Sequence, residues 1–97
     1  MKELLFVFNP IAGRSKIKNY LFEIIDTFIK CGYSVNTYST QEIGDATSVI
    51  ANIDKHYDLI VCAGGDGTLN EVVSGLMRRE ESIPLGYIPL GSMNDVA

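Results

Sequence analysis

The feature that most constrains this chain is a short apolar run that ends in glycines and leads into a helical pattern. The run 59–63 is aliphatic and stops at Gly64, which is typical of a buried strand. Gly64, Gly65 and Gly67 then surround a single acid, Asp66. Beyond this turn, apolar residues recur at the spacing of an amphipathic helix: Leu69, Val72, Val73, Leu76 and Met77. Strand, glycine turn and helix in this order are typical of an α/β protein.

A turn of this kind presents backbone N–H groups to an anion. The first N–H groups of a helix have no intrahelical partner, and the helix start carries a partial positive charge. Glycines let the backbone approach a phosphate without a Cβ in the way. A P-loop is excluded because no lysine follows Lys55, and the dinucleotide fingerprint fails because Asn70 stands where its third glycine belongs. The spacing predicts a phosphate-binding turn of a third kind.

The acid in the turn makes the prediction more specific. A carboxylate 4 Å from a phosphate charge is repelled by about 4 kcal/mol at an effective dielectric near 20. A helix dipole offsets only about 0.3–1 kcal/mol of this. If Asp66 faces a triphosphate, it therefore needs Mg²⁺, or a water or hydroxyl that it can bind instead. An alternative without a ligand is also open, because Thr68 and Glu71 fit the capping box of a helix.

The same alternation of strands and helices continues along the whole chain. Strands are expected at 4–8, 34–39, 59–63 and 85–88, with helices between them. The pattern βαβαβαβ predicts a three-layer αβα fold with a parallel sheet, for which we expect the strand order 2-1-3-4. Ligands of such sheets bind at the carboxyl ends of the strands. We therefore expect the segments 9–15, 64–68 and 91–95 to line one crevice.

The ends and faces of the helices can also be predicted. Gly32 is expected to end the first helix in a left-handed conformation, and Asp45 to cap the second. Residues 78–81 are expected to form a solvated helix end. The buried face of the first helix, which starts near residue 15 or 16, is predicted to consist of Ile17, Tyr20, Leu21, Ile24, Ile25 and Phe28.

Polar residues of the loops have the chemistry to hold a nucleotide. They are Asn9, Gly13, Arg14, Thr40, Asn94 and Asp95. Arg14 can neutralise a terminal phosphate with its forked guanidinium, and Asn9 offers an amide. These positions also fit roles without a ligand, because Asn9-Pro10 is typical of an Asx turn and Arg14 of the solvated side of a helix. Asn94 and Asp95 fit a helix cap and first turn, and Thr40 fits a strand end.

Composition limits the partners. A net charge of -4 argues against a nucleic-acid partner, which would need a basic face. The apolar runs fall far short of the roughly 20 residues of a membrane span, and we expect no signal peptide. Cys31 and Cys62 are expected to be free thiols of a cytoplasmic protein, and with His56 as the only histidine no zinc site is predicted.

Three motifs together resemble one family, the diacylglycerol kinase catalytic domain. Residues 9–13 (Asn-Pro-Ile-Ala-Gly) resemble its Asn-Pro-x-Ser/Ala-Gly opening. Residues 64–73, followed by Gly75-Leu76, are similar to its Gly-Gly-Asp-Gly-Thr central motif. Residues 88–97 resemble its Pro-Leu-Gly-Thr-Gly-Asn-Asp-Phe-Ala segment, with Ser-Met in place of Thr-Gly. Thr40 stands where the family has a threonine after its second strand. The resemblance covers the whole chain, in the right order.

The resemblance implies an ATP- and Mg²⁺-dependent lipid kinase, related to bacterial diacylglycerol, sphingosine and ceramide kinases, with the fold shared by NAD kinases and diacylglycerol kinases. It implies that Asp66 acts through a metal–water network rather than by direct activation of the nucleophile. With the loop positions above, the expected nucleotide site consists of Asn9, Gly13, Arg14, Thr40, Gly64, Gly65, Gly67, Thr68, Glu71, Gly91, Asn94 and Asp95.

The family continues into a β-sandwich domain that supplies the lipid pocket, the general base and further metal ligands. Residues 1–97 are accordingly expected to be the N-terminal nucleotide-binding domain, inactive alone, with a diacylglycerol-like acceptor bound by the absent domain. The expected location is cytoplasmic, with a peripheral, transient membrane contact and a homodimer both left open. Two alternatives remain: an NAD kinase-like enzyme, which also carries Gly-Gly-Asp-Gly-Thr, and a non-catalytic nucleotide-binding or dimerising module.

Overall fold

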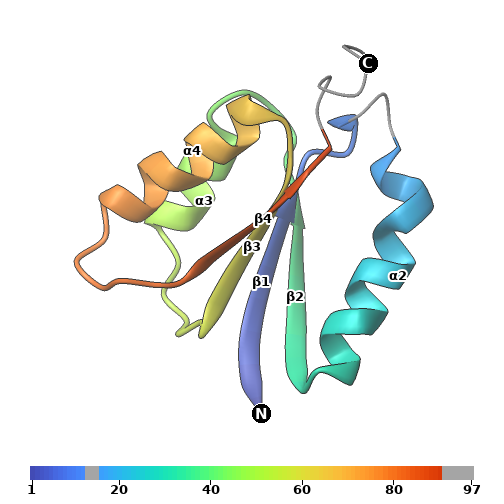
Figure 1. Cartoon of the computed structure of the whole chain (residues 1–97). Coiled ribbons are helices and arrows are strands. Elements are labelled where there is room, and N and C mark those ends of the chain that lie inside the picture. The colour runs from blue at the N-terminus through green and yellow to red at the C-terminus, as the bar shows by residue number, and fades with distance from the viewer. Residues whose placement is uncertain (13–15, 91–97) are drawn as a thin grey trace.

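The apolar runs form the strands of one sheet, and the segments between them form its helices. The computed structural model describes residues 1–12 and 16–90. Its elements, labelled in Figure 1, are β1 (Lys2–Phe8), α2 (Ile17–Lys30), β2 (Tyr33–Ser39), α3 (Asp45–Ala51), β3 (Leu59–Gly64), α4 (Asp66–Met77) and β4 (Leu85–Pro89). The predicted alternation of strand and helix is confirmed, with element ends shifted by one or two residues.

The sheet is parallel throughout, and its strand order is β2-β1-β3-β4. This confirms the predicted order 2-1-3-4. The carboxyl ends of the strands are level, because Phe8 of β1 pairs with both Ser39 of β2 and Ala63 of β3. Pro89 of β4 pairs in turn with Gly64, the last residue of β3. The loops that follow these strands therefore begin along one edge of the sheet.

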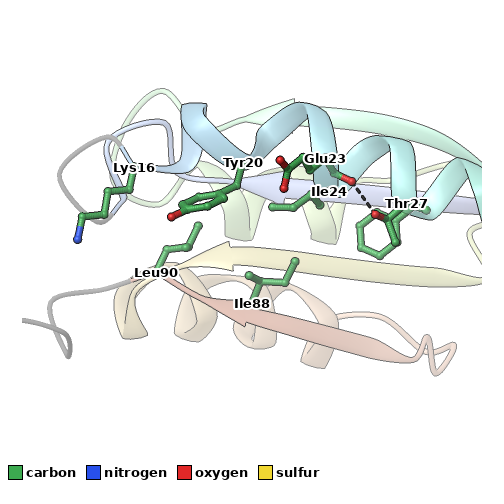
Figure 2. Close-up of a pocket in the computed structure, with 8 residues that line it drawn as sticks. Lys16, Tyr20, Glu23, Ile24, Thr27, Ile88 and Leu90 are labelled. Atoms are coloured by element: carbon green, nitrogen blue, oxygen red, sulfur yellow. Dashed lines mark hydrogen bonds between the residues drawn. The ribbon is translucent and has the colours of Figure 1, made fainter.

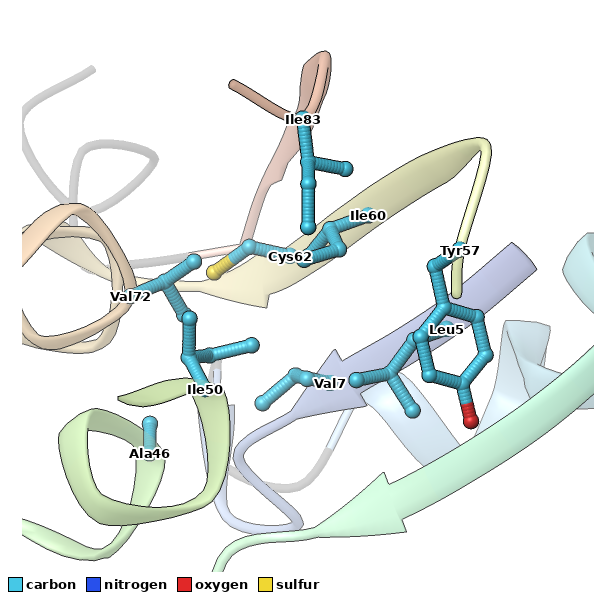
Figure 3. Packing of buried hydrophobic residues seen from close by; sticks show 9 residues of the cluster. All are labelled: Leu5, Val7, Ala46, Ile50, Tyr57, Ile60, Cys62, Val72 and Ile83. Atoms are coloured by element: carbon cyan, nitrogen blue, oxygen red, sulfur yellow. The ribbon is translucent and has the colours of Figure 1, made fainter. Parts of the chain in front are cut away.

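Helices cover both faces of the sheet, with α2 on one side and α3 and α4 on the other (Figure 1). Side chains of β1 alternate between the two sides as the pleat requires. One buried cluster lies under α2 and consists of Leu4, Phe6, Phe8, Ile17, Val61 and Ala63. The other, drawn in Figure 3, consists of Leu5, Val7, Ala46, Ile50, Tyr57, Ile60, Cys62, Val72 and Ile83. Strands β1 and β3 are apolar on both faces because each face is covered, which confirms the three-layer αβα fold.

The two helices on the second face pack very closely. A Cβ added to Gly75 of α4 would lie 2.7 Å from the Cβ of Ile50 and 2.8 Å from the carbonyl oxygen of Thr47. The hydroxyl of Thr47 also donates to the backbone carbonyl of Glu71, at 2.7 Å. The position of α3 is therefore fixed directly against α4, the helix that starts at the glycine turn.

Several predictions about helix ends can be checked. Gly32 follows α2 with φ of 96°, as predicted, and its N–H donates to the carbonyl of Ile29. The predicted capping role of Asp45 is wrong, because Gly44 holds the cap position and Asp45 is the first helical residue. The predicted solvated end at 78–81 is wrong for Arg79, whose side chain is 13% exposed and donates to the carbonyls of Ile50 and Ile53.

Three residues assigned to the apolar faces of helices are exposed. Met77 and Val73 of α4 are 80% and 37% exposed, and Tyr20 of α2 is 49% exposed. Among the residues that the structure describes, no helix has both the length and the apolarity that crossing a membrane requires.

Candidate functional site

The carboxyl edge of the sheet is held together one residue beyond the strands. Three backbone hydrogen bonds continue the ladder there: Asn9 N–H to Ala63 O (3.1 Å), Thr40 N–H to Phe8 O (2.9 Å) and Leu90 N–H to Gly64 O (2.9 Å). The first residues of the loops after β1 and β2 therefore lie in register with the glycine turn. This edge brings together segments that are far apart in the sequence.

A cavity of about 240 Å³ opens at this edge. It is lined by the three segments 9–11, 40–43 and 68–71, through Asn9, Pro10, Ile11, Thr40, Gln41, Glu42, Ile43, Thr68 and Glu71. Four residues that the sequence singled out, Asn9, Thr40, Thr68 and Glu71, thus line one cavity. Gly64, Gly65, Asp66 and Gly67 form the turn that leads from β3 into α4 just before Thr68.

Helix α4 begins with backbone N–H groups that have no acceptor within the helix. Gly65 is its cap residue, and the first hydrogen bond of the helix runs from the N–H of Leu69 to the carbonyl of Gly65, at 3.2 Å. The N–H groups of Asp66, Gly67 and Thr68 therefore have no acceptor one turn back in the helix. Among the described residues, no side chain makes a capping hydrogen bond at this end of the helix. An anion placed here would meet several N–H donors and the positive end of the helix dipole.

The glycines of the turn differ in what requires them. A Cβ on Gly64 would lie 2.8 Å from Oγ1 of Thr68, so packing alone excludes a side chain there. A Cβ on Gly67 would meet nothing within 4 Å among the described residues. The fold therefore needs Gly64, whereas the open space beside Gly67 leaves its backbone accessible to a ligand.

The capping-box interpretation of Thr68 and Glu71 is wrong. The helix starts two residues before Thr68, and Thr68 is buried. Glu71 does satisfy a helix N–H, but that of the neighbouring helix, because its Oε1 accepts from the N–H of Ala46 in α3 at 3.2 Å. The carboxylate of Glu71 thus holds the start of α3 against the cavity.

Asn9 makes the turn that its sequence context suggested. Its Oδ1 accepts from the N–H of Ile11 at 3.0 Å, which confirms the Asx turn. Because the turn uses the side-chain oxygen, the amide NH₂ is the group that Asn9 can offer to a ligand. The structural role and the predicted ligand role therefore fall on different atoms of one side chain.

Tyr87 of β4 forms a hydrogen bond to the glycine turn, and this role was not predicted from the sequence. Its hydroxyl donates to the carbonyl of Gly64 at 3.1 Å. Burial raises the pKa of Tyr87, and the negative charge of Asp66 raises it further. The hydroxyl therefore stays protonated and remains a donor at neutral pH. The available signal was a lone aromatic hydroxyl in the strand that follows the glycine turn, which by itself indicates nothing.

The thiol of Cys62 is not suited to catalysis. Burial raises its pKa to about 12, with a further contribution from the charge of Glu71. The nucleophilic thiolate is therefore scarce at neutral pH. Both cysteines are free, as predicted, with Cys31 exposed and Cys62 buried.

The acids at this edge fit one kind of metal site. The described residues hold no cluster of three or more His, Cys, Asp or Glu side chains that could bind a metal by themselves. Asp66 is exposed in the first turn of α4, beside the free N–H groups. Mg²⁺ keeps several waters and is bound by one or two carboxylates together with substrate phosphates. A single exposed carboxylate beside an anion site matches that mode.

Five predicted site residues lie outside the described residues: Gly13, Arg14, Gly91, Asn94 and Asp95. Ser92 and Met93, which replace the Thr-Gly of the family motif, lie outside the described residues as well.

A larger cavity, of about 540 Å³, lies between α2 and β4 (Figure 2). Its lining is largely apolar and consists of Lys16, Tyr20, Glu23, Ile24, Thr27, Phe28, Ile88 and Leu90. None of the predicted site residues that the structure describes lines it. The cavity therefore does not belong to the predicted nucleotide site.

Proteins that resemble this chain in sequence and in fold include diacylglycerol kinases. The chain matches the diacylglycerol kinase catalytic domain over residues 3–97. It is 41% identical over 98 residues to a diacylglycerol kinase of Bacillus subtilis, covering 100% of this chain and 32% of that protein. It is 37% identical over 95 residues to one of Staphylococcus saprophyticus, covering 97% of this chain and 31% of that protein.

A solved structure supports the same relationship. The crystal structure of a diacylglycerol kinase from Bacillus anthracis superimposes with a TM-score of 0.82 at 33% identity, covering 97% of this chain and 35% of that one. This chain thus spans about a third of the length of its relatives. The family match includes the glycine turn and β4, and the structural match covers nearly the whole chain. The chain therefore belongs to the diacylglycerol kinase catalytic domain family.

Proposed function

We propose that this chain is the nucleotide-binding part of a kinase that transfers the γ-phosphoryl group of ATP to the hydroxyl of a diacylglycerol-like lipid. Membership of the family supports the reaction class. The observation that carries the proposal is that Asn9, Thr40 and Thr68, from three separate segments, line one cavity at the start of α4. Because the relatives are about three times as long, the complete activity is proposed for a longer protein.

The two parts of a nucleotide fit different parts of this edge. Glu42 and Glu71 line the cavity, so the uncharged nucleoside is favoured there over phosphate groups. The phosphates fit the start of α4, where the N–H groups of Gly67 and Thr68 have no acceptor within the helix. A hydrogen bond that involves a charged group contributes about 1.5–3 kcal/mol, so a few such bonds suffice for binding. Asn9 and Thr40 are proposed to hold the nucleotide between these two parts.

The remaining predicted residues are proposed to complete the site. Gly13 and Arg14 follow the Asn9 turn in the sequence, and the guanidinium is proposed to neutralise a terminal phosphate. Gly91, Asn94 and Asp95, which come just after β4, are proposed to contribute from the other side. Phosphoryl transfer depends mainly on positioning and charge neutralisation, which such a set of loops can provide.

Magnesium is proposed as the metal, bound indirectly by Asp66. When bound with the nucleotide, the ion would neutralise phosphate charge. Asp66 would orient its water ligands from the first turn of α4. At roughly 4 kcal/mol of repulsion for a carboxylate 4 Å from a phosphate charge, direct contact between Asp66 and the nucleotide is disfavoured. The general base is proposed to lie in a second domain, the β-sandwich that binds the lipid.

The proposal also places the protein in the cell. A cytoplasmic kinase with a lipid acceptor must meet its substrate at the membrane surface, so a transient, peripheral contact made by the second domain is proposed. A homodimer is compatible with this arrangement.

The decisive test is a transfer assay with the full-length gene product. We expect it to phosphorylate diacylglycerol in detergent micelles from ATP, and EDTA to abolish the reaction. Asp66→Asn is expected to lower activity about 10–100-fold, as loss of an outer-sphere metal partner typically does. The matched control Asp26→Asn, in a partly exposed carboxylate of α2, should leave activity unchanged.

NAD offered in the same assay decides the acceptor. Phosphorylation of NAD in place of the lipid would contradict the proposed acceptor class. Binding of Mg·ATP without transfer to either acceptor would indicate a non-catalytic nucleotide-binding module.

A further inference from the structure

The loop 40–44 between β2 and α3 forms one wall of the nucleotide-site cavity. Four of its residues, Thr40 to Ile43, line the cavity. The loop cannot be held by a hydrophobic core, because Ile43 is 97% exposed. Other contacts must fix its conformation, since a mobile loop would lower the affinity for any ligand that it contacts.

The carboxylate of Asp45 connects both ends of this loop. Asp45 is the first residue of α3, immediately after the loop. Its Oδ1 and Oδ2 lie 2.9 and 2.8 Å from the hydroxyl of Tyr38, near the end of β2. Its Oδ2 also accepts from the N–H of Gln41 at 2.7 Å. One side chain thus binds the strand before the loop, the loop itself and the helix after it.

The hydroxyl of Tyr38 is well suited to this contact. Its hydrogen bond to the Asp45 carboxylate raises the pKa of Tyr38, with smaller contributions from desolvation and from the charges of Asp45 and Glu42. Tyr38 therefore remains a donor throughout the physiological pH range. Gln41 adds a second tie, because its side-chain amide donates to the carbonyl of Ser39 at 2.9 Å.

The helix end of the loop is in turn attached to α4. The N–H of Ala46 donates to Oε1 of Glu71, and the hydroxyl of Thr47 donates to the carbonyl of Glu71. Because α4 begins at the glycine turn, these bonds set the position of the loop 40–44 relative to that turn. Asp45 directly follows the loop and does not itself line the cavity.

We propose that Asp45 is a positioning residue, which holds the loop 40–44 in its nucleotide-binding conformation through the Tyr38 hydroxyl and the Gln41 N–H. The inference rests on the proposed nucleotide site. Asp45 touches no reacting atom, so its loss lowers the population of the competent loop and not the rate of the chemical step. If the loop is competent a tenth of the time, the apparent affinity for ATP falls about tenfold.

The test is a split between KM and kcat in the full-length kinase. We expect Asp45→Ala to raise KM for ATP about tenfold, with kcat and the KM for the lipid acceptor little changed. Tyr38→Phe keeps the ring and removes one donor, so a smaller rise in KM for ATP is expected. The double variant should be no worse than Asp45→Ala, because both changes break the same contact.

Two controls make the result specific. Asp26→Ala removes a partly exposed carboxylate of α2, which among the described residues pairs with Lys30 at 2.8 Å, and should change neither constant. Asp45→Asn keeps one carbonyl oxygen for Tyr38, so a partial rescue relative to Asp45→Ala is expected. If Asp45→Ala does not fold, Tyr38→Phe decides by itself.

The outcomes separate the two proposals. A wild-type protein that binds ATP while Asp45→Ala and Tyr38→Phe leave KM for ATP unchanged overturns the positioning role alone. Equal losses for ATP, lipid and kcat overturn it too, because they indicate general damage to the fold. A wild-type protein without any nucleotide binding overturns both proposals.

Discussion

Two glycines of one turn show how residues of the same type can serve different ends. The missing side chain of Gly64 makes room for Thr68, whose Oγ1 would otherwise lie 2.8 Å from a Cβ. A Cβ on Gly67 would contact no atom of the described part of the chain. Glycine at position 64 is required by the packing of the fold, whereas glycine at position 67 fits the close approach of a ligand.

Substitution by alanine should separate these two roles. Gly64→Ala overpacks the turn and is expected to lower the free energy of unfolding by about 1–3 kcal/mol. Gly67→Ala lies in the first turn of a helix, where alanine is favoured over glycine by up to about 1 kcal/mol, so stability should not fall. Its affinity for Mg·ATP should nevertheless fall, because the Cβ enters the space open to a phosphate.

Urea denaturation and calorimetry with Mg·ATP give the two readouts. Similar losses of stability in both variants would contradict this assignment of roles. Unchanged nucleotide affinity in Gly67→Ala would show that no ligand approaches its backbone.

At the scale of elements, α3 is the shortest of the three described helices, and both of its ends are bound by side chains from outside it. Helix α3 has 7 residues, and isolated helices of fewer than about 12 are marginal in water. Glu71 of α4 binds an N–H in its first turn, and Arg79 binds the carbonyls of Ile50 and Ile53 at its other end. Glu71 in α4 and Arg79 just after it thus bind backbone groups at both ends of α3. The loop 40–44, which lines the cavity, leads directly into α3.

Removing the guanidinium of Arg79 should therefore destabilise the fold. Arg79→Met keeps an apolar stem of similar length and breaks the bonds to Ile50, Ile53 and Glu81. We expect a loss of about 1–3 kcal/mol in the free energy of unfolding, because two partly buried carbonyls lose a charged donor.

The adjacent arginine provides the matched control. Arg78 is exposed, so Arg78→Met should change stability by less than about 0.5 kcal/mol. Urea unfolding of both variants checks the difference. Equal effects would mean that the hydrogen bonds of Arg79 contribute nothing to the stability of α3.

At the scale of the whole molecule, the parallel sheet gathers the loops that follow its strands at one edge. The strand order reverses between β1 and β3, and the loops after these two strands lie side by side there. A crevice at such a point needs no special sequence beyond small and polar residues in the loops. The relatives are about three times as long as this chain, and we propose that their additional length binds the lipid acceptor.

Residues 1–97 produced alone should therefore bind Mg·ATP but not phosphorylate lipid. Binding is expected because Asn9, Thr40 and Thr68 all lie within this length. Transfer is not expected, because the proposed general base and lipid pocket lie outside it. Calorimetry and the micelle transfer assay measure the two properties separately. Lipid phosphorylation by this fragment would contradict the proposed division.

The sequence by itself determined the class of fold, the strand order and the position of the glycine turn. The class of fold and the glycine turn follow from local rules, since alternating patterns and glycine conformations involve neighbouring residues. The strand order was predicted from the rule that ligand loops of such sheets meet where the order reverses. The convergence of Asn9, Thr40 and Thr68 was predictable for the same reason, as each follows a parallel strand.

Only the tertiary structure decided the partners of the polar side chains. Glu71 fits a cap for its own helix, yet it binds Ala46, 25 residues away, because α3 packs against α4. Arg79 has the sequence context of a solvated end, yet it binds Ile50, 29 residues away. Asp45 has the sequence context of a helix cap, yet its carboxylate binds the hydroxyl of Tyr38 and the N–H of Gln41. A hydrogen bond depends on the distance between two groups, and for residues so far apart in the chain packing sets that distance.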